Sequence, residues 1–449
     1  MTGTAVRELE GGKDGGVITA EYTIPGLHVR DHVVPVPLDW ADPDGAAIEV
    51  FARELVSPAK RRDDLPLLCF LQGGPGGSSP RPMDASGWLG ALLERYRVVL
   101  LDQRGTGRSS RIDAAKARSF RSGEEGAAHL AHFRADSIVR DAEHLRITVF
   151  GGRRWSTLGQ SYGGFLTLTY LSLAPEGLAS CLVTGGLASL QPDAAEVYRR
   201  TYPRALAKNL EYERRYPADT AVIARIADRL AAGDVRLPDG DVLTVRRFQH
   251  LGAGFGMGPG FEEVHWLVDE AFSSSDGEPS DTFLDQVLTR TSFADGPLWA
   301  VLQEPIYADP ASGATAWAAQ AEHERHPEFA ETARPLRFTG EMMYPWMFEE
   351  IRLLRPFRDT AEALARRTDW DPLYDRERLA GNEVPVAAAV YFDDLYVDAG
   401  LQLETAAAVG NVRTWVTNEW EHDGIRASGD RVVRHLLELI DERGGPLGD

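Results

Sequence analysis

The chain has 449 residues, of which 43% are hydrophobic and 26% are charged, an ordinary composition for a globular protein. Its 68 acidic residues outnumber its 48 basic residues and give a net charge of −20, which argues against binding to nucleic acid or to anionic membrane surfaces. A chain of this length suffices for about two or three domain-sized units.

The sequence lacks signals for export, membrane insertion and disulfide formation. The first ten residues contain no apolar run suited to a signal peptide, and no stretch approaches the roughly 18 consecutive apolar residues of a membrane span. Cys69 and Cys181 each lie inside an apolar run and are expected to be buried strand residues. We therefore expect a cytoplasmic protein in a reducing compartment.

The first part of the chain predicts a sheet. Residues 17–56 alternate between apolar and polar side chains, as in antiparallel strands with one exposed face. Residues 65–71 and 96–101 are almost uninterrupted apolar runs, which suit strands buried on both faces of a parallel sheet. Helix-like stretches occur near residues 88–95 and 135–150. Strands that alternate with helices predict an α/β sheet.

A further predicted strand, at residues 156–158, leads into Gly-Gln-Ser-Tyr-Gly at residues 159–163 and then into a helix-like pattern. This is the strand–turn–helix context of a nucleophile elbow, a turn so tight that it requires glycine two residues before and after the serine. The turn holds the serine at a helix N-terminus, whose dipole favours developing negative charge. Ser161 is therefore the predicted nucleophile, with an ordinary glycine-rich turn as the alternative.

The pattern changes near residue 190. From residue 193 to about residue 369 the sequence is mostly helical and rich in aromatic residues, and strand patterns then resume. We predict an α/β core interrupted by an insertion. The core comprises residues 1–190 and 381–449, and a helical cap domain comprises residues 191–380.

The resumed sheet supplies partners for Ser161. An activated serine needs a base and an acid that orients the base, and in α/β hydrolases the chain order is serine, acid, histidine. His422 follows one of the resumed strands, at the sheet edge where ligand-facing residues collect, and is the predicted base. Asp394, two residues past the other strand, is the predicted acid. Asp393 and Asp398 remain alternatives for the acid.

A glycine-rich loop, Gln-Gly-Gly-Pro-Gly-Gly at residues 72–77, follows an apolar run. Backbone N–H groups near Gly74, together with the N–H of Tyr162, are predicted to form an oxyanion hole. A phosphate-binding loop would end in Gly-Lys-Ser/Thr, but this run ends in Gly-Gly-Ser-Ser. In the nearby turn, Asp102 and Arg104 are expected to form structural ion pairs.

Three motifs stand in order along the chain: Gln-Gly-Gly-Pro-Gly-Gly from residue 72, Asp-Gln-Arg-Gly-Thr-Gly-Arg-Ser from residue 102, and Gly-Gln-Ser-Tyr-Gly-Gly from residue 159. Together they resemble the proline iminopeptidase (prolyl aminopeptidase) family of α/β-hydrolase serine peptidases. Segments at residues 303–307 and 338–346 look like the cap of the family's longer-chain members. With the sequences around Asp394 and His422, the resemblance covers most of the chain from about residue 30.

The chain departs from the family pattern at two places. The family's usual His-Gly-Gly-Pro-Gly begins here with Gln72, which should not disable a hole made of backbone groups. The shorter members place the triad acid in Gly-Arg-Tyr-Asp, whereas this chain has Tyr-Phe-Asp-Asp, which ends at Asp394. Alignment of these turns puts Asp394 on the acid.

The resemblance implies an α/β-hydrolase fold: a mostly parallel sheet with antiparallel N-terminal strands, helices on both faces and an inserted helical cap. It also implies a serine aminopeptidase that releases an N-terminal residue, preferentially proline, through an acyl-enzyme. The expected partners are small peptides with a free N-terminus, and no cofactor or metal is expected. An esterase or amidase for a small metabolite is the alternative activity, and a non-catalytic binding protein is the rival from another class.

Recognition of a protonated α-amine calls for carboxylates from the cap. Glu304 and Glu341 match the family's acidic cap positions and stand in apolar, aromatic sequence, where a carboxylate is costly unless partnered. An internal ion pair with arginine is the alternative for each. Glu262 and Glu263 are weaker candidates that suit a helix surface. A pocket for the proline ring would draw on cap aromatics, for which the candidates are Phe255, Trp266, Tyr307, Tyr344 and Trp346.

Overall fold

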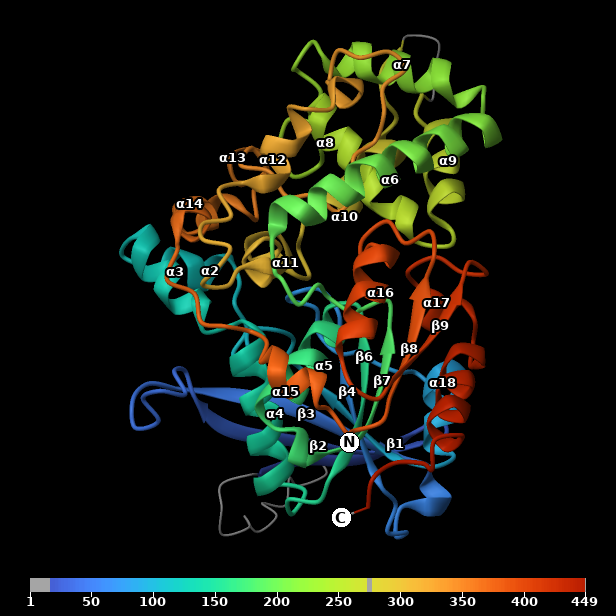
Figure 1. Ribbon diagram of the computed structural model, residues 1–449. Coiled ribbons are helices and arrows are strands. Elements are labelled where there is room, and N and C mark those ends of the chain that lie inside the picture. Colours follow the sequence, from blue (N-terminus) through green and yellow to red (C-terminus); the bar gives the residue numbers. More distant parts are fainter. Residues whose placement is uncertain (1–16, 273–276, 449) are drawn as a thin grey trace, which may run out of the picture.

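The computed structural model describes residues 17–272 and 277–448 (Figure 1). The N-terminal segment inspected above for a signal peptide lies outside the described residues. The described residues form a nine-stranded sheet with strand order β1-β2-β3-β5-β4-β6-β7-β8-β9. Helices cover the sheet, and a further group of helices lies beyond one end of it (Figure 1). This is the predicted α/β-hydrolase fold with inserted helices.

The N-terminal strands form the antiparallel part of the sheet. β1 (Val17–Ile24), β2 (Leu27–Pro37) and β3 (Ala47–Val56) pair in sequence order, and β3 then pairs antiparallel with β5 (Arg97–Leu101). The alternating sequence explains this region, because one face of β1 and β2 packs inward while the other is more open to water.

The remaining strands are parallel. β4 (Leu67–Leu71) lies between β5 and β6 (Trp155–Gln160), followed by β7 (Leu178–Thr184), β8 (Val386–Tyr391) and β9 (Val412–Thr417). Every residue of β4, β6, β7 and β8 is buried, which explains the apolar sequences of β4 and β8 and the mostly apolar sequence of β7. β7 and β8 are hydrogen-bonded neighbours although the whole helical insertion separates them in the chain.

Successive side chains of each parallel strand enter two separate cores. In β4, Leu68 and Phe70 join one core, and Cys69 joins the core on the opposite face. Cys69 and Cys181 are both buried and free, as predicted. The helices that pack on the sheet are α1 (Gly87–Leu93), α17 (Gly424–Ala427) and α18 (Arg431–Asp441) on one face, and α4 (Ala135–Thr148), α5 (Tyr162–Leu173) and α16 (Ala399–Ala408) on the other.

The segment between β7 and β8 is mainly helical. Its longer elements are α6 (Ala194–Arg215), α7 (Asp219–Leu230), α8 (Val245–Gln249), the 3-10 helix η3 (His250–Gly256), α9 (Gly260–Asp269), α10 (Asp281–Thr291), α11 (Pro297–Leu302), α12 (Ala318–His323), α13 (Met347–Glu350) and α14 (Arg358–Arg366). α15 (Arg376–Ala380) packs against α5, beside the sheet. The boundaries of the cap at residues 191 and 380 stay a prediction.

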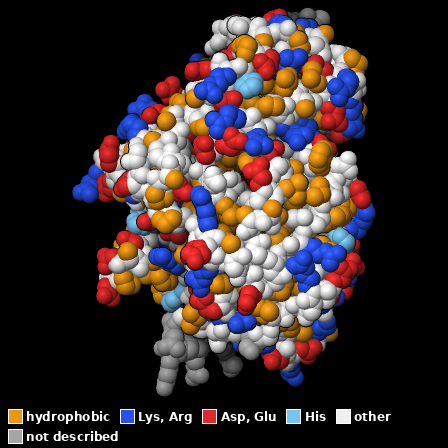
Figure 2. All heavy atoms as spheres, viewed as in Figure 1, with side chains coloured by type: hydrophobic (Ala, Val, Ile, Leu, Met, Phe, Trp, Pro, Cys, Tyr) orange, Lys and Arg blue, Asp and Glu red, His pale blue; other side chains and the backbone are white. Residues whose placement is uncertain are grey.

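The surface is charged and mixed. Figure 2 shows acidic and basic side chains interspersed on the face that it draws. None of the described helices is both long and apolar enough to span a bilayer.

The turn after β5 is held by two buried carboxylates, as its sequence predicted. Asp102 accepts hydrogen bonds from Arg81 at 2.5 and 2.9 Å. Arg104 is fully buried and pairs with Asp141 of α4 at 2.5 and 2.7 Å. It also donates to three main-chain carbonyls, so one guanidinium joins β2, α4 and the turn.

Replacement of Arg104 by Met should lower the free energy of unfolding by about 3–5 kcal/mol, because it leaves the Asp141 carboxylate buried without its cation. Denaturant titration measures the loss. The matched control is Arg95→Met, whose partner Asp441 is exposed, and this change should cost less than about 1 kcal/mol. Similar losses for both variants would contradict the structural role of the buried pair.

Candidate active site

Ser161 lies between β6 and α5 with φ +56° and ψ −123°, a conformation that L-residues rarely adopt. Its N–H donates to the carbonyl of Thr184 on β7 at 2.9 Å. Its carbonyl accepts the N–H of Gly164 at 2.7 Å. The strained turn is therefore fixed on both sides, as a nucleophile elbow requires.

The two glycines of the elbow stand where no side chain fits. A Cβ on Gly163 would lie 1.9 Å from the carbonyl oxygen of Leu71 on β4. A Cβ on Gly159 would lie 2.3 Å from the carbonyl oxygen of Gly163. Glycine lets the elbow helix approach β4 closely enough to present Ser161 above the sheet.

His422 and Asp394 form a buried pair at the ends of β9 and β8. His422 Nδ1 and Asp394 Oδ2 are 2.7 Å apart. The other oxygen of Asp394 accepts the N–H groups of Tyr396 at 2.8 Å and Val397 at 3.1 Å. Every oxygen of the carboxylate is thus engaged, which fixes the imidazole ring and leaves its Nε2 for a reacting group.

The structure separates the three candidate acids. Asp394 contacts His422, whereas the half-buried Asp393 accepts a hydrogen bond from Arg204 at 3.3 Å. Asp398 caps α16 by accepting the N–H of Leu401 at 3.0 Å. Only Asp394 has the geometry of the acid that orients the base.

Burial lowers the pKa of His422, but the charge of Asp394 and its hydrogen bond outweigh burial, so the pKa is raised overall. Glu341 adds to this rise. His422 therefore binds a proton more readily than a free imidazole does. A general base needs this property, because it carries a positive charge during turnover.

Two glycines that the sequence analysis did not single out connect the nucleophile to the acid–base pair. Gly185 has φ +55°, and a Cβ there would lie 3.1 Å from His422 Nδ1 and 3.3 Å from Asp394 Oδ2. A Cβ on the next residue, Gly186, would lie 2.3 Å from the carbonyl oxygen of Ser161. In the sequence, the Gly-Gly pair directly after the apolar run of β7 was the signal that could have indicated this close packing.

The glycine-rich loop lies against Ser161. A Cβ on Gly73 would be 2.9 Å from Cβ of Ser161, and Gly74 has φ +136°. Tyr162 is the first residue of α5, where a backbone N–H has no acceptor within its own helix. The loop and the helix start thus meet at the nucleophile, and the oxyanion hole from Gly74 and Tyr162 stays a prediction.

Glu341 lies near the acid–base pair. Its Oε1 accepts a hydrogen bond from Trp299 Nε1 at 3.0 Å. Loss of water raises its pKa to about 7, with His422 acting to lower that pKa and Asp394 to raise it. Within residues 17–272 and 277–448, no Lys or Arg forms a salt bridge with Glu341. Because the side chain is only half-buried, its carboxylate is open to a cation from outside.

Glu304 has a different environment. It is buried, and its Oε1 accepts the N–H of Ala319 at the start of α12 at 2.9 Å. Burial raises its pKa to about 7, against the lowering effect of these backbone N–H groups. Burial raises the pKa of Tyr198 on α6, and the charges of Glu304 and Glu341 add to this rise, so Tyr198 lies near both glutamates. The role of Glu304 as a second amine ligand stays a prediction.

The remaining candidates divide by exposure. Among the aromatics, Tyr307 lies near Glu341 and Asp394, and its ring is 5.7 Å from that of Phe165 on α5. Trp266 is 61% exposed. The candidates that pack in the core among other cap residues are Phe255, Tyr344 and Trp346.

Of the two weaker carboxylates, Glu262 pairs with Arg215 and Glu263 is exposed on α9.

The cap holds the loop that carries His422. The N–H of His422 donates to the carbonyl of Gly256 in η3 at 3.0 Å. Lys208 of α6 is buried and pairs with Glu421 at 2.5 Å. The N–H of Gly258 donates to Asp423 at 3.0 Å. The cap therefore contacts three consecutive residues of this loop, Glu421, His422 and Asp423.

In the described part of the chain, no cluster of three or more His, Cys, Asp or Glu side chains is arranged to hold a metal ion.

Comparisons with known proteins identify the family. Residues 66–227 match the family described as alpha/beta hydrolase fold. The proline iminopeptidase of Aeromonas sobria is 43% identical over 420 residues, which cover 93% of this chain and 98% of that protein. The chain belongs to the proline iminopeptidase family.

Two further similarities were found. "Proline iminopeptidase aneH" of Aspergillus aculeatus is 34% identical over 419 residues, 91% of this chain and 92% of that protein. Among solved structures, 2-hydroxy-6-oxo-6-phenylhexa-2,4-dienoate hydrolase from Rhodococcus sp. strain RHA1 is 16% identical with a TM-score of 0.44, and the match covers 92% of this chain and 99% of that chain.

In this member of the proline iminopeptidase family, Lys208→Met should slow the labelling of Ser161 by a fluorophosphonate probe about tenfold or more. The change leaves the Glu421 carboxylate beside His422 without its cation, in a site where burial already raises the pKa of Glu421. The double variant Lys208→Met/Glu421→Gln should recover most of the labelling rate, because it removes the unpaired charge.

The matched control is Arg204→Met, since Arg204 also lies on α6 but pairs with Asp393, whose side chain is more exposed than that of Glu421. Its labelling rate should change little. If Lys208→Met labels as fast as Arg204→Met, the ion pair does not position His422.

Proposed function

We propose that the protein is a serine aminopeptidase that releases the N-terminal residue, preferentially proline, from small peptides with a free N-terminus. The observation that carries the proposal is the carboxylate of Glu341, half-buried near the His422–Asp394 pair and without a salt bridge to any Lys or Arg among the described residues. An anion in such a site is costly unless a cation meets it. The ammonium of a peptide N-terminus supplies that cation.

Each catalytic side chain has a defined task in this mechanism. Ser161 attacks the carbonyl carbon of the first peptide bond while His422 Nε2 takes the hydroxyl proton. Asp394 stabilises the resulting imidazolium, and the N–H groups near Gly74 and of Tyr162 stabilise the oxyanion. His422 then gives the proton to the leaving amine as the peptide bond breaks. Water, deprotonated by His422, hydrolyses the acyl-enzyme and regenerates Ser161.

Glu341 would also explain why only the first residue is removed. Pairing with the ammonium fixes the distance from the N-terminus to the reacting carbonyl, so the first peptide bond meets Ser161. A blocked or extended N-terminus would bring an uncharged amide to the carboxylate and leave it unpaired, which disfavours binding.

We also propose a cytoplasmic location. Cys69 and Cys181 are buried free thiols, as is usual for proteins in a reducing compartment.

The variant Glu341→Gln should reduce kcat/KM on prolyl naphthylamide about 10–100-fold, because it removes a charge-assisted hydrogen bond to the ammonium. Hydrolysis of a neutral aryl acetate should change less than about threefold, since that substrate has no amine. Steady-state kinetics on both substrates measure the difference.

Glu324→Gln is the matched control, because Glu324 is an exposed cap carboxylate whose partner is Gln320 on its own helix. It should leave both rates unchanged. Equal losses on both substrates in Glu341→Gln would instead favour an esterase or amidase for small metabolites. The triad alone does not distinguish these activities.

Activity on an amine substrate should fall steeply on acidification. The pKa of Glu341 is raised to about 7, and the pKa of His422 is raised as well. Both groups must be deprotonated on an amine substrate, so log kcat/KM should fall with a slope approaching about 2 per pH unit below this region. A neutral ester needs only His422 and should give a slope approaching about 1.

Profiles of kcat/KM against pH measure these slopes. In Glu341→Gln, the slope on the amine substrate should approach that on the ester. Identical slopes for both substrates in the unaltered protein would contradict an ionised Glu341 at the amine site.

A further inference from the structure

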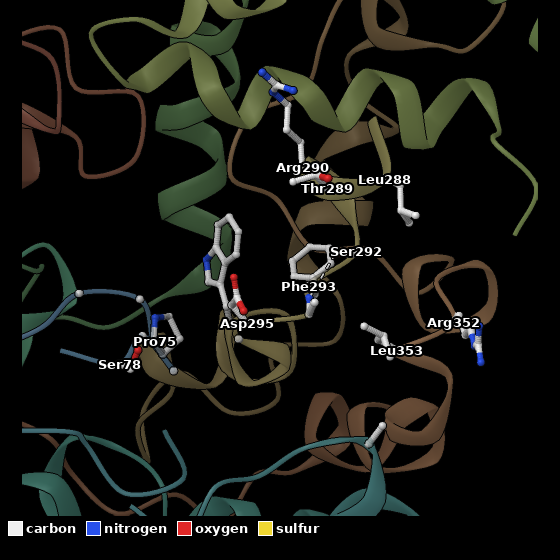
Figure 3. Close-up of a pocket in the computed structure, with 18 of the residues that line it drawn as sticks. Pro75, Ser78, Leu288, Thr289, Arg290, Ser292, Phe293, Asp295, Arg352 and Leu353 are labelled. Atoms are coloured by element: carbon white, nitrogen blue, oxygen red, sulfur yellow. Dashed lines mark hydrogen bonds between the residues drawn. The ribbon is translucent and has the colours of Figure 1, made fainter. Parts of the chain in front are cut away.

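A cavity of about 840 Å³ lies between the glycine-rich loop and the cap (Figure 3). Its volume is within the roughly 300–1,000 Å³ of typical ligand pockets. Residues 72–78 of the loop form one wall, and residues 288–296 with Trp299 form the facing wall. Leu353 closes a further side, and Figure 3 shows it opposite Pro75.

The cavity adjoins the candidate active site at two points. Gly73 lies in its wall and is also next to Ser161. Trp299 also lies in its wall and donates its indole N–H to Glu341. A substrate whose ammonium meets Glu341 and whose carbonyl meets Ser161 would therefore have open space beyond the glycine-rich loop for its remaining residues.

Phe293 is the distinctive residue of this cavity. Its φ of +56° is rare for a bulky aromatic residue and is held by neighbouring contacts. Its ring stacks on His250 at 5.6 Å and packs against Trp299 at 5.4 Å. With Leu288 and Leu353 it gives the cavity an apolar lining.

The charged residues of the cavity wall are mainly basic. Arg118, Arg290 and Arg352 are exposed, and within the described residues none of them has a carboxylate partner in salt-bridge distance. Of the two acidic residues, Asp239 already accepts the N–H of Asp241 at 3.1 Å. A protein of net charge −20 thus presents an excess of arginine at this cavity.

Building on the proposed aminopeptidase function, we propose that this cavity binds the leaving part of the substrate. The apolar side chain of the second substrate residue packs on Phe293, Leu288 and Leu353. The free C-terminal carboxylate of a short peptide is attracted by the arginines, of which Arg352 lies on the far side from Pro75 in Figure 3. The preferred substrates are therefore short peptides with an apolar second residue and a free C-terminus.

The first test compares Pro-Gly amide, Pro-Leu amide and Pro-Phe amide by release of proline. The expected kcat/KM for Pro-Phe amide exceeds that for Pro-Gly amide by about tenfold or more, as apolar pockets discriminate. In Phe293→Ala this ratio should shrink to about threefold or less. Tyr22→Ala, an exposed aromatic residue on β1, should keep the full ratio. Equal kcat/KM for all three amides in the unaltered protein would overturn the proposal.

The second test compares Pro-Leu-Gly as the free acid and as its C-terminal amide. The free acid should be preferred about threefold to tenfold at low salt, and salt should weaken the preference. Arg118→Gln/Arg352→Gln should abolish the preference, whereas Arg140→Gln, an exposed position on α4, should retain it. A preference that is absent in the unaltered protein or survives the double variant would overturn the carboxylate site.

These outcomes are separable from failure of the proposed function. If no prolyl peptide is cleaved, the aminopeptidase assignment fails; if all are cleaved at equal kcat/KM, only the cavity assignment fails. Thermal unfolding of each variant identifies one that does not fold. In that case the substrate series in the unaltered protein and the exposed arginine variants test whether the cavity binds the leaving part of the substrate.

Discussion

The close approach of main chains around Ser161 is the constraint on which the site depends. The left-handed turn at Ser161 is stable because β4 and the peptide after β7 pack directly on it, with glycine at each contact. That same peptide borders the imidazole of His422 through Gly185. Nucleophile and base are therefore placed by backbone packing rather than by flexible side chains, which is the condition for preorganised catalysis.

Three buried or half-buried carboxylates near the site differ in how they are satisfied. Asp394 is hydrogen-bonded on both oxygens, one of them to His422, which fits its proposed task of orienting that ring. Glu304 is buried, with one oxygen accepting the N–H of Ala319 at the start of α12 and the other without a hydrogen-bond partner among the described residues. Glu341 has neutral partners, Trp299 and Gln303, and is only half-buried. Glu341 differs from Glu304 in being only half-buried and in lying beside the His422–Asp394 pair, as the proposed ammonium site requires.

The sequence predicted the parts of the site that depend on local order along the chain. Ser161, Asp394, His422 and the glycine-rich loop each follow a strand, and parallel strands bring their carboxyl ends to one edge of the sheet. Glu304 and Glu341 stood in similar apolar sequence, so their different environments followed only from packing. Contacts between distant segments, such as Lys208 with Glu421 or Trp299 with Glu341, left no local signal. The paired glycines after β7 are visible in the sequence, but the sequence analysis did not assign them to the site.

The interruption of the sheet between β7 and β8 has a consequence for biosynthesis. The ribosome completes the strand and helix that carry Ser161 well before β8 and β9, because the helical insertion is translated between them. Until then the outer edge of β7 has no strand to pair with, and its main-chain groups are open to wrong partners. The proposed nucleophile Ser161 is likewise translated long before His422, the proposed base, which follows β9. On that proposal, the serine can be activated only after β8 and β9 have joined the sheet.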